Sequence, residues 1–210
     1  MTAPTPLSDR TIGYYLDTLG SAAPAPGGGS VTGVMGALAA ALGQMVLNVT
    51  MKGATDPGLE SQVSGLGERM REFISGAEAD EAAYGGYVAA TQLPKGTTEE
   101  KATRRAALQE ALHASARAPL AVAINATGLL ADLVSVIERG ATNILSDAEI
   151  AILLAEATVS ASLINLRINL PLIRDASVAA ALAAEGNHLE ELARAHAQQC
   201  RNALAARRTP

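Results

Sequence analysis

Apolar residues along the chain recur at helical spacing or in unbroken runs, and turn residues separate these stretches. The spacing predicts a short amphipathic helix over residues 12–19 and a buried helix over residues 31–51, with Ser8 and Ser30 as their N-caps. Further helices are expected over residues 57–92, 98–139, 147–170, 175–184 and 188–201. The sequence shows no strand-like alternation, hairpin signal or linker, so it predicts one all-α domain over residues 1–210.

Capping residues and helix breakers set the expected ends of these helices. Asp56 followed by Pro57 is typical of an N-cap and the first helical position. Three other pairs have the capping spacing of a polar residue and a glutamate: Thr97 with Glu100, Ser146 with Glu149, and Asn187 with Glu190. Pro119 is expected to kink or interrupt the fourth long helix, and Gly140 to end it.

Small residues mark the helix over residues 31–51. Gly33, Gly36, Ala40 and Gly43 recur on it, which predicts close approach by a neighbouring helix. Three stretches, residues 31–49, 118–137 and 150–166, are near the minimum of about 17 residues for a membrane span. Each carries polar side chains and lacks an aromatic belt, so we interpret them as central helices of a soluble bundle with no membrane partner.

Composition narrows the function classes. The chain has 210 residues, of which 49% are hydrophobic and 2% aromatic, so its core consists of aliphatic side chains. The formal net charge of -5 argues against a nucleic acid partner. The single cysteine, Cys200, excludes an intrachain disulfide, and with no secretory signal at the N-terminus it fits the cytoplasm. The three histidines lack metal-ligand spacing, so no metal site is expected.

The candidate functional groups of the sequence are carboxylates, side-chain amides and a glycine turn. Gly27, Gly28 and Gly29 precede a helix, where free N–H groups form a cradle for an anion or a carbonyl group, or serve simply as a turn. No Ser/His/Asp or Cys/His set is present, which argues against covalent catalysis. Acid/base work by a carboxylate on a bound small molecule stays open, as does a binding or scaffold role.

Several motifs in fixed order carry a resemblance to a known family. They are APAPGGGSVTG at residues 23–33, Asp80-x-x-Ala83-Tyr84, Leu-Pro-Lys at residues 93–95, Pro119, Asn143 followed by Ser146-Asp147-Ala148, LLAEA at residues 153–157, and NLRINL at residues 165–170. Over residues 8–172 the chain resembles the C-terminal family of formiminotransferase-cyclodeaminases, which includes methenyltetrahydrofolate cyclohydrolases. Tyr84 stands where the family usually has phenylalanine, and no formiminotransferase domain is present in the sequence.

The resemblance implies an up-and-down helical bundle that forms a homodimer and acts on tetrahydrofolate derivatives without a metal or redox cofactor. The absence of a transferase domain favours a 5,10-methenyltetrahydrofolate cyclohydrolase. A formiminotetrahydrofolate cyclodeaminase that releases ammonia is the first alternative. A helical dimer that binds folate or a protein partner without turnover is the second. Helices rich in glycine and alanine also favour pairing with a second copy on physical grounds.

The resemblance also implies roles for individual residues. Asp147 and Asp80 are candidates for the carboxylate that stabilises the methenyl cation and takes a proton from water, or for pairing with N–H groups of the pterin. Lys52, Lys95 and Arg167 are candidates for receiving the glutamate tail of the substrate or for protonating a leaving nitrogen. Substrate-binding residues are expected to be Gly27, Gly28, Gly29, Ser30, Asn48, Lys95, Asn143, Ser146, Asn165, Arg167 and Asn169. These groups are expected to line one folate pocket. The simpler alternatives are a helix-start carboxylate for Asp147, a solvated acid for Asp80, a surface position for Lys95, and bridges between helices or subunits for the asparagines.

Overall fold

The computed structural model describes residues 5–53 and 55–208, and within these residues every regular element is a helix. The α-helices of this part are α1 Ile12–Leu19, α2 Gly28–Met51, α3 Pro57–Thr91, α4 Thr98–Arg139, α5 Leu145–Asn169 and α6 Ala176–Arg208. Short 3-10 turns precede α1 and flank α5: η1 Leu7–Asp9, η2 Thr142–Ile144 and η3 Leu170–Leu172. The prediction of an all-α fold is confirmed.

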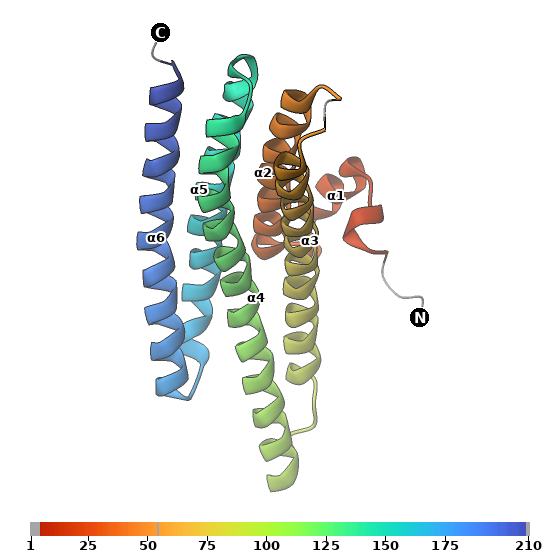
Figure 1. The fold of residues 1–210 in the computed structure, drawn as a ribbon. Coiled ribbons are helices and arrows are strands. Elements are labelled where there is room, and N and C mark those ends of the chain that lie inside the picture. Colours follow the sequence, from red (N-terminus) through yellow and green to blue (C-terminus); the bar gives the residue numbers. More distant parts are fainter. Residues whose placement is uncertain (1–4, 54, 209–210) are drawn as a thin grey trace.

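The long helices α2 to α6 alternate in direction and form an up-and-down bundle, with α1 lying to one side of it (Figure 1). Helix α4 packs against α3, α5 and α6, and α2 packs against α3 and α5. The first turns of α4 project beyond the other helices (Figure 1). Aliphatic side chains dominate the core, and the single phenylalanine, Phe73, is completely buried in it.

Helices α2 and α3 approach closely because α2 carries glycines at the contact. A Cβ atom at Gly36 would lie 2.4 Å from the ring of Phe73, and one at Gly33 would lie 2.6 Å from the carbonyl oxygen of Phe73. Real Cβ atoms do not tolerate such distances, so the two positions require glycine. The predicted role of small residues along this helix is therefore confirmed for these two positions.

Two of the six expected N-caps are found. Asp56 accepts hydrogen bonds from the first backbone N–H groups of α3, and Thr97 with Glu100 forms the capping box of α4. Ser8, Ser30 and Ser146 were wrong as N-caps, because α1 begins after Thr11, α2 after Gly27 and α5 after Ile144. In the first two cases the true cap lies three residues from the expected serine, at a residue type that also caps well.

Two expected helix breaks do not occur. Helix α4 runs through Pro119 without interruption, and the segments expected over residues 175–184 and 188–201 are one helix, α6. Asn187 therefore lies inside a helix, and the cap at the start of α6 is Asp175, whose carboxylate accepts from the N–H groups of Ser177 and Val178. Gly186 fits this continuous helix because it packs against leucines of α5, where a Cβ atom would come within 2.8 Å of Leu166.

Apolar side chains are not confined to the core. By length and composition alone, Gly28–Met51, Thr98–Arg139 and the helical stretch Thr142–Leu172 are long and apolar enough to cross a membrane, and about half of each apolar window is buried inside the bundle. Exposed apolar side chains line the neighbouring helices α2 and α5: Leu38, Met45, Val49, Ile150, Leu153, Ile164 and Ile168. We call this surface the α2/α5 face.

Candidate active site

A cavity of about 210 Å³ lies where α2 begins. Four segments of the chain line this cavity: the glycine turn before α2, the middle of α3, the middle of α4 and the end of α5. Its polar lining includes Gly28, Gly29, Asp80, Ser115, Asn165 and Asn169, and Tyr84 also borders it. The structure thus brings together the glycine turn, Asp80 and the two α5 asparagines, which lie far apart in the sequence.

Asp80 faces the backbone of the glycine turn at close range. A Cβ atom at Gly29 would lie 2.0 Å from Oδ1 of Asp80, so the carboxyl group occupies the space that any other side chain at residue 29 would need. The backbone N–H of Ser30 donates a hydrogen bond to this carboxyl group. The N-terminal end of α2 also favours a negative charge at this place. Gly29 therefore makes room for a protein carboxyl group rather than for a ligand.

The environment of Asp80 makes it a better proton carrier than an ordinary aspartate. Burial raises the pKa of its carboxyl group, and the negative charge of the adjacent Glu81 raises the pKa further. The hydrogen bond from Ser30 N–H acts in the opposite direction without cancelling these effects. A half-buried carboxyl group with a raised pKa in a cavity is a typical acid/base group.

A polar network holds the turn against α3. Glu81 accepts two hydrogen bonds from the guanidinium group of Arg10, at 3.1 and 3.0 Å, and one from the Ser30 hydroxyl group at 3.1 Å. The hydroxyl group of Tyr15 lies 3.2 Å from that of Ser30. Sequence reasoning missed Arg10, Tyr15 and Glu81, because no local pattern links residue 10 to residue 81.

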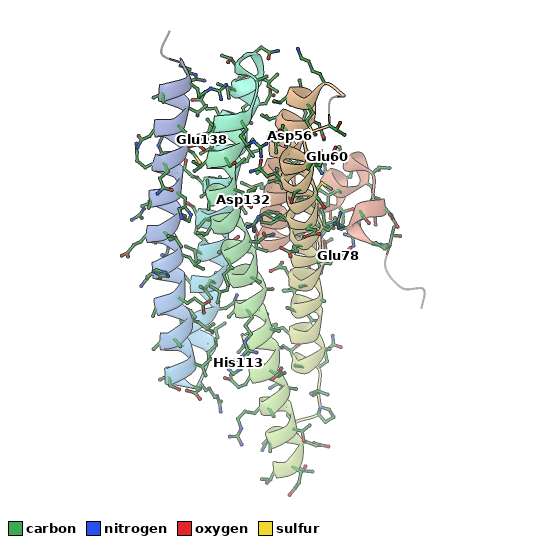
Figure 2. The ribbon with its side chains drawn as sticks, in the orientation of Figure 1. Asp56, Glu60, Glu78, His113, Asp132 and Glu138 are labelled. Atoms are coloured by element: carbon green, nitrogen blue, oxygen red, sulfur yellow. The ribbon has the colours of Figure 1, made fainter. Side chains whose placement is uncertain are left out.

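A second contact joins the N-terminal segment to the same helix. The backbone N–H of Leu7 donates to the carboxylate of Glu78 at 2.7 Å. Figure 2 shows Glu78 on the side of α3 that faces the N-terminal segment. Because Arg10 and Leu7 bind α3 within one turn of Asp80, η1 and α1 support the wall of the cavity.

Asn169 is held by a carbonyl group that Pro119 leaves free. In an α-helix the carbonyl of residue 115 accepts from the N–H of residue 119, but proline has no N–H. The side-chain amide of Asn169 donates instead to the Ser115 carbonyl at 3.0 Å, and to the Asn165 carbonyl at 2.9 Å. Both N–H bonds of Asn169 are thus used, and its amide oxygen remains as an acceptor for a ligand.

Five of the expected site residues lie at the opposite end of the bundle: Asn48, Lys52, Asn143, Ser146 and Asp147. At 1.5 Å per helical residue, Asp147 is about 27 Å from Asn165 along α5. Lys52 ends α2 in the left-handed conformation, with φ of 47°. Within a single chain, these five residues therefore do not line one pocket with the glycine turn.

Two further expected residues also lie away from the cavity. Arg167 points toward α6, where its guanidinium group pairs with Glu190 at 2.5 Å. Lys95 is exposed in the turn before α4, beside another cavity. Neither residue lines the cavity at Asp80.

Other reactive groups do not offer an alternative centre in the described chain. Cys200 is completely buried, and burial raises the pKa of its thiol to about 12, so a thiolate is not available at neutral pH. Residues 5–53 and 55–208 hold no cluster of three or more His, Cys, Asp or Glu side chains suited to a metal ion. Within the described residues, Asp80 is the carboxyl group that is half buried, lines a cavity and has a raised pKa.

Known proteins resemble this chain in sequence and fold. The model of the formiminotransferase-cyclodeaminase family matches residues 11–188. A methenyltetrahydrofolate cyclohydrolase of Methylorubrum extorquens is 37% identical over 166 residues, which are 77% of this chain and 79% of that protein. A formimidoyltransferase-cyclodeaminase of Gallus gallus is 30% identical over 173 residues, 80% of this chain, and this chain spans 32% of that protein. The crystal structure of a formiminotetrahydrofolate cyclodeaminase from Thermotoga maritima superposes with a TM-score of 0.83 at 27% identity, covering 95% of this chain and 98% of that one.

Proposed function

Because the chain belongs to the formiminotransferase-cyclodeaminase family, we propose that it is a 5,10-methenyltetrahydrofolate cyclohydrolase. The observation that carries the proposal is the half-buried carboxyl group of Asp80 in a cavity between the glycine turn and two asparagines. The identity of 37% to a protein named for this reaction, over most of both chains, supports it. The second candidate is the cyclodeaminase reaction, because proteins named for it also match most of this chain.

The reaction suits a single carboxyl group. The methenyl bridge between N5 and N10 is a delocalised cation, which a nearby carboxylate stabilises. As water adds to the bridging carbon, Asp80 takes one of its protons, and a neutral hydroxyl adduct forms. The bond from carbon to N5 then breaks while N5 gains a proton and the hydroxyl group loses one. The formyl group stays on N10, and one proton is released overall.

The remaining cavity residues suit the recognition of a pteridine. The free amide oxygen of Asn169 accepts from a ring N–H group, and Tyr84 offers an aromatic face at the cavity. The cavity is smaller than the ~300 Å³ at which sites for drug-sized ligands begin. It therefore holds the reacting end of the substrate, and the remainder lies along the protein surface outside it.

A parallel assay of two folates tests the function. The purified protein is expected to accelerate the loss of the near-ultraviolet absorbance of methenyltetrahydrofolate, and to do so equally in the presence of a chelator, because water addition needs no metal. Ammonia release from formiminotetrahydrofolate is measured beside it. If ammonia is released faster than the methenyl compound is hydrolysed, the protein is a cyclodeaminase. If neither substrate is consumed, the protein binds folate or a partner without turnover.

We also propose a cytoplasmic homodimer in which a second copy covers the α2/α5 face. Apolar patches of this kind mark contact surfaces. The cavity at Asp80 lies at one end of this face, and Lys52 and Asp147 lie at the other. A two-fold axis across the middle of the face, perpendicular to the helices, places the far end of one copy beside the cavity of its partner. The residues that are separated within one chain then meet between two chains.

Mixed dimers test this arrangement directly. Asp80→Ala and Asp147→Ala homodimers are each expected to be nearly inactive, because every site lacks one carboxylate. Unfolding and refolding an equal mixture is expected to restore about a quarter of the wild-type activity, since half of the dimers are mixed and each has one intact site. Each variant refolded alone is the control. No recovery from a mixture that contains dimers, or a monomeric mass in solution, would refute the shared site.

A further inference from the structure

Glu81 borders the Asp80 cavity, but both oxygens of its carboxylate accept hydrogen bonds from the protein. Oε1 accepts from the Ser30 hydroxyl group and from Nη1 of Arg10, and Oε2 accepts from Nη2 of Arg10. The Arg10 and Glu81 side chains are only 13% and 16% exposed, and Nε of Arg10 donates to the Thr5 carbonyl at 3.0 Å. A shielded ion pair with two parallel contacts fixes both side chains in one geometry.

The Ser30 hydroxyl group belongs to the same network. Ser30 is completely buried, and its single hydroxyl proton goes to Glu81. In the contact of 3.2 Å between the Ser30 and Tyr15 hydroxyl groups, Tyr15 is therefore the donor and the Ser30 oxygen the acceptor. Burial raises the pKa of the Tyr15 phenol, so this donor keeps its proton. Every proton in the network thus has an assigned acceptor, and the first turn of α2 is tied to Glu81.

The backbone of Ser30 connects this network to Asp80. Its N–H donates to the Asp80 carboxyl group, while its hydroxyl group donates to Glu81. One residue at the start of α2 therefore touches both carboxyl groups of α3. A displacement of Glu81 would move the Ser30 side chain, and with it the N–H group that faces Asp80.

The charged groups around Asp80 come from α3 and from the N-terminal segment alone. Helix α2 borders the cavity with glycine backbone, and α4 and α5 border it with neutral side chains: Ser115, Asn165, Ile168 and Asn169. The titratable groups that face Asp80 are Glu81 and Tyr84 of α3, with Tyr15 and the Arg10 cation behind them. The negative charge of Glu81 raises the pKa of Asp80, and Arg10 offsets part of that charge.

We propose that Arg10 is a positioning residue for the reaction at Asp80, because its ion pair with Glu81 holds the Ser30 N–H against the Asp80 carboxyl group. The inference rests on the proposed function and extends it to a residue that does not border the cavity. Arg10 has no contact with the reacting atoms, so it acts on Asp80 through Glu81. It also screens Asp80 from the Glu81 charge, which helps the base to stay ionised.

Loss of the Arg10 charge is expected to change the pH profile. The base works only when ionised, so kcat/KM falls at low pH as Asp80 gains a proton. In Arg10→Gln the two adjacent carboxyl groups repel each other unscreened and hold a proton to higher pH. The midpoint of the fall is expected to rise by about 0.5–1 pH unit. The plateau kcat is expected to drop by about threefold to tenfold, since the Ser30 N–H is held less firmly.

Arg10→Lys separates the charge of Arg10 from its geometry. Lysine keeps the positive charge but cannot form the two parallel contacts of a guanidinium group. This variant is expected to restore the wild-type midpoint and to leave kcat reduced. A midpoint as high as that of Arg10→Gln would show that the charge of residue 10 has no part in the effect.

Glu81→Gln is expected to move the midpoint in the opposite direction. The amide carries no charge, so Asp80 loses its proton at lower pH. The double variant Arg10→Gln/Glu81→Gln is expected to match Glu81→Gln alone, because Arg10 then has no carboxylate to act through. Arg69→Gln is the matched control. Arg69 joins α3 to Asp132 of α4 outside the cavity, so its loss is expected to lower Tm without moving the midpoint.

An NMR titration without substrate separates this inference from the proposed function. The ¹³C signal of the Asp80 carboxyl group is assigned by its absence in Asp80→Asn. If Arg10→Gln raises and Glu81→Gln lowers the pKa of Asp80 while neither folate is consumed, the action of Arg10 on Asp80 stands and the proposed reaction is rejected.

The converse result overturns the positioning role and keeps the cyclohydrolase. It is turnover of methenyltetrahydrofolate by Arg10→Gln with an unchanged midpoint and an unchanged NMR titration. A double variant whose midpoint lies well above that of Glu81→Gln would also overturn it, because Arg10 would then act without Glu81. If Arg10→Gln does not fold, Arg10→Lys must still lower kcat and Glu81→Gln must still lower the midpoint, and failure of either refutes the inference.

Discussion

Asp80→Asn is expected to lower kcat by about 10²- to 10⁴-fold, the range for loss of a general acid/base group. The amide keeps the size and polarity of the carboxyl group but takes no proton from water and carries no charge to stabilise the methenyl cation. The pH profile gives a second readout. The base works only when ionised, so wild-type kcat/KM is expected to fall as the pH drops through the raised pKa of Asp80. In Asp80→Asn this fall of kcat/KM at low pH is expected to be absent.

The same variant is expected to be at least as stable as the wild type. Because the pKa of Asp80 is raised in the folded state, the fold binds this proton more tightly than the unfolded chain does. The ionised carboxylate therefore destabilises the fold above the raised pKa, and the effect disappears as the pH falls below the unfolded value. A neutral amide removes this penalty, so Tm at pH 7 is expected to be unchanged or higher. A loss of activity accompanied by a Tm several degrees lower would show a structural role instead.

Gly29→Ala is expected to lower kcat/KM by about a hundredfold or more, equivalent to about 2.7 kcal/mol of transition-state stabilisation. Its Cβ atom would occupy the position of the Asp80 carboxyl group, at 2.0 Å from Oδ1. The side chain of Asp80 must then rotate away from Ser30 N–H, which misplaces the base. Activity assays and thermal unfolding measure the two consequences, and the loss of activity is expected to exceed the loss of stability.

Gly65→Ala provides the matched control for this substitution. Residue 65 lies inside α3, and a Cβ atom there meets nothing within 4 Å. Alanine is expected to leave activity unchanged and to stabilise the helix by about 0.5–1 kcal/mol. Wild-type activity in Gly29→Ala would mean that the carboxyl group of Asp80 need not touch the turn.

Local signals predicted the helices well where one residue and its near neighbours decide the structure. The capping box at Thr97 and the N-cap at Asp56 depend on contacts three residues apart, and both are confirmed. The continuity of α6 could not be predicted in this way. Asn187 has the sequence of a cap, but packing of Gly186 against α5 keeps that position helical.

The site, too, has residues that the sequence predicted and contacts that it could not predict. Motif resemblance pointed to Asp80, the glycine turn, Asn165 and Asn169, and the fold places these residues around one cavity. The Arg10 contact with Glu81 joins residues 71 positions apart and has no local signature. The separation of Lys52 from the glycine turn, in contrast, follows from the length of α2 alone, since a continuous helix of 24 residues is about 36 Å long. A motif order therefore identifies the members of a site better than it identifies which of them meet within one chain.

Pro119 shows that a proline inside a long helix can help to hold a neighbouring helix in place. A proline within a long helix is usually counted as a defect, yet here it creates a vacant acceptor one turn earlier, at the Ser115 carbonyl, which fixes a side chain from another helix. Restoring an N–H with Pro119→Ala would let the helix reclaim that carbonyl and set the Asn169 amide free. A proline inside a helix thus predicts that the carbonyl group four residues before it accepts a hydrogen bond from another part of the fold.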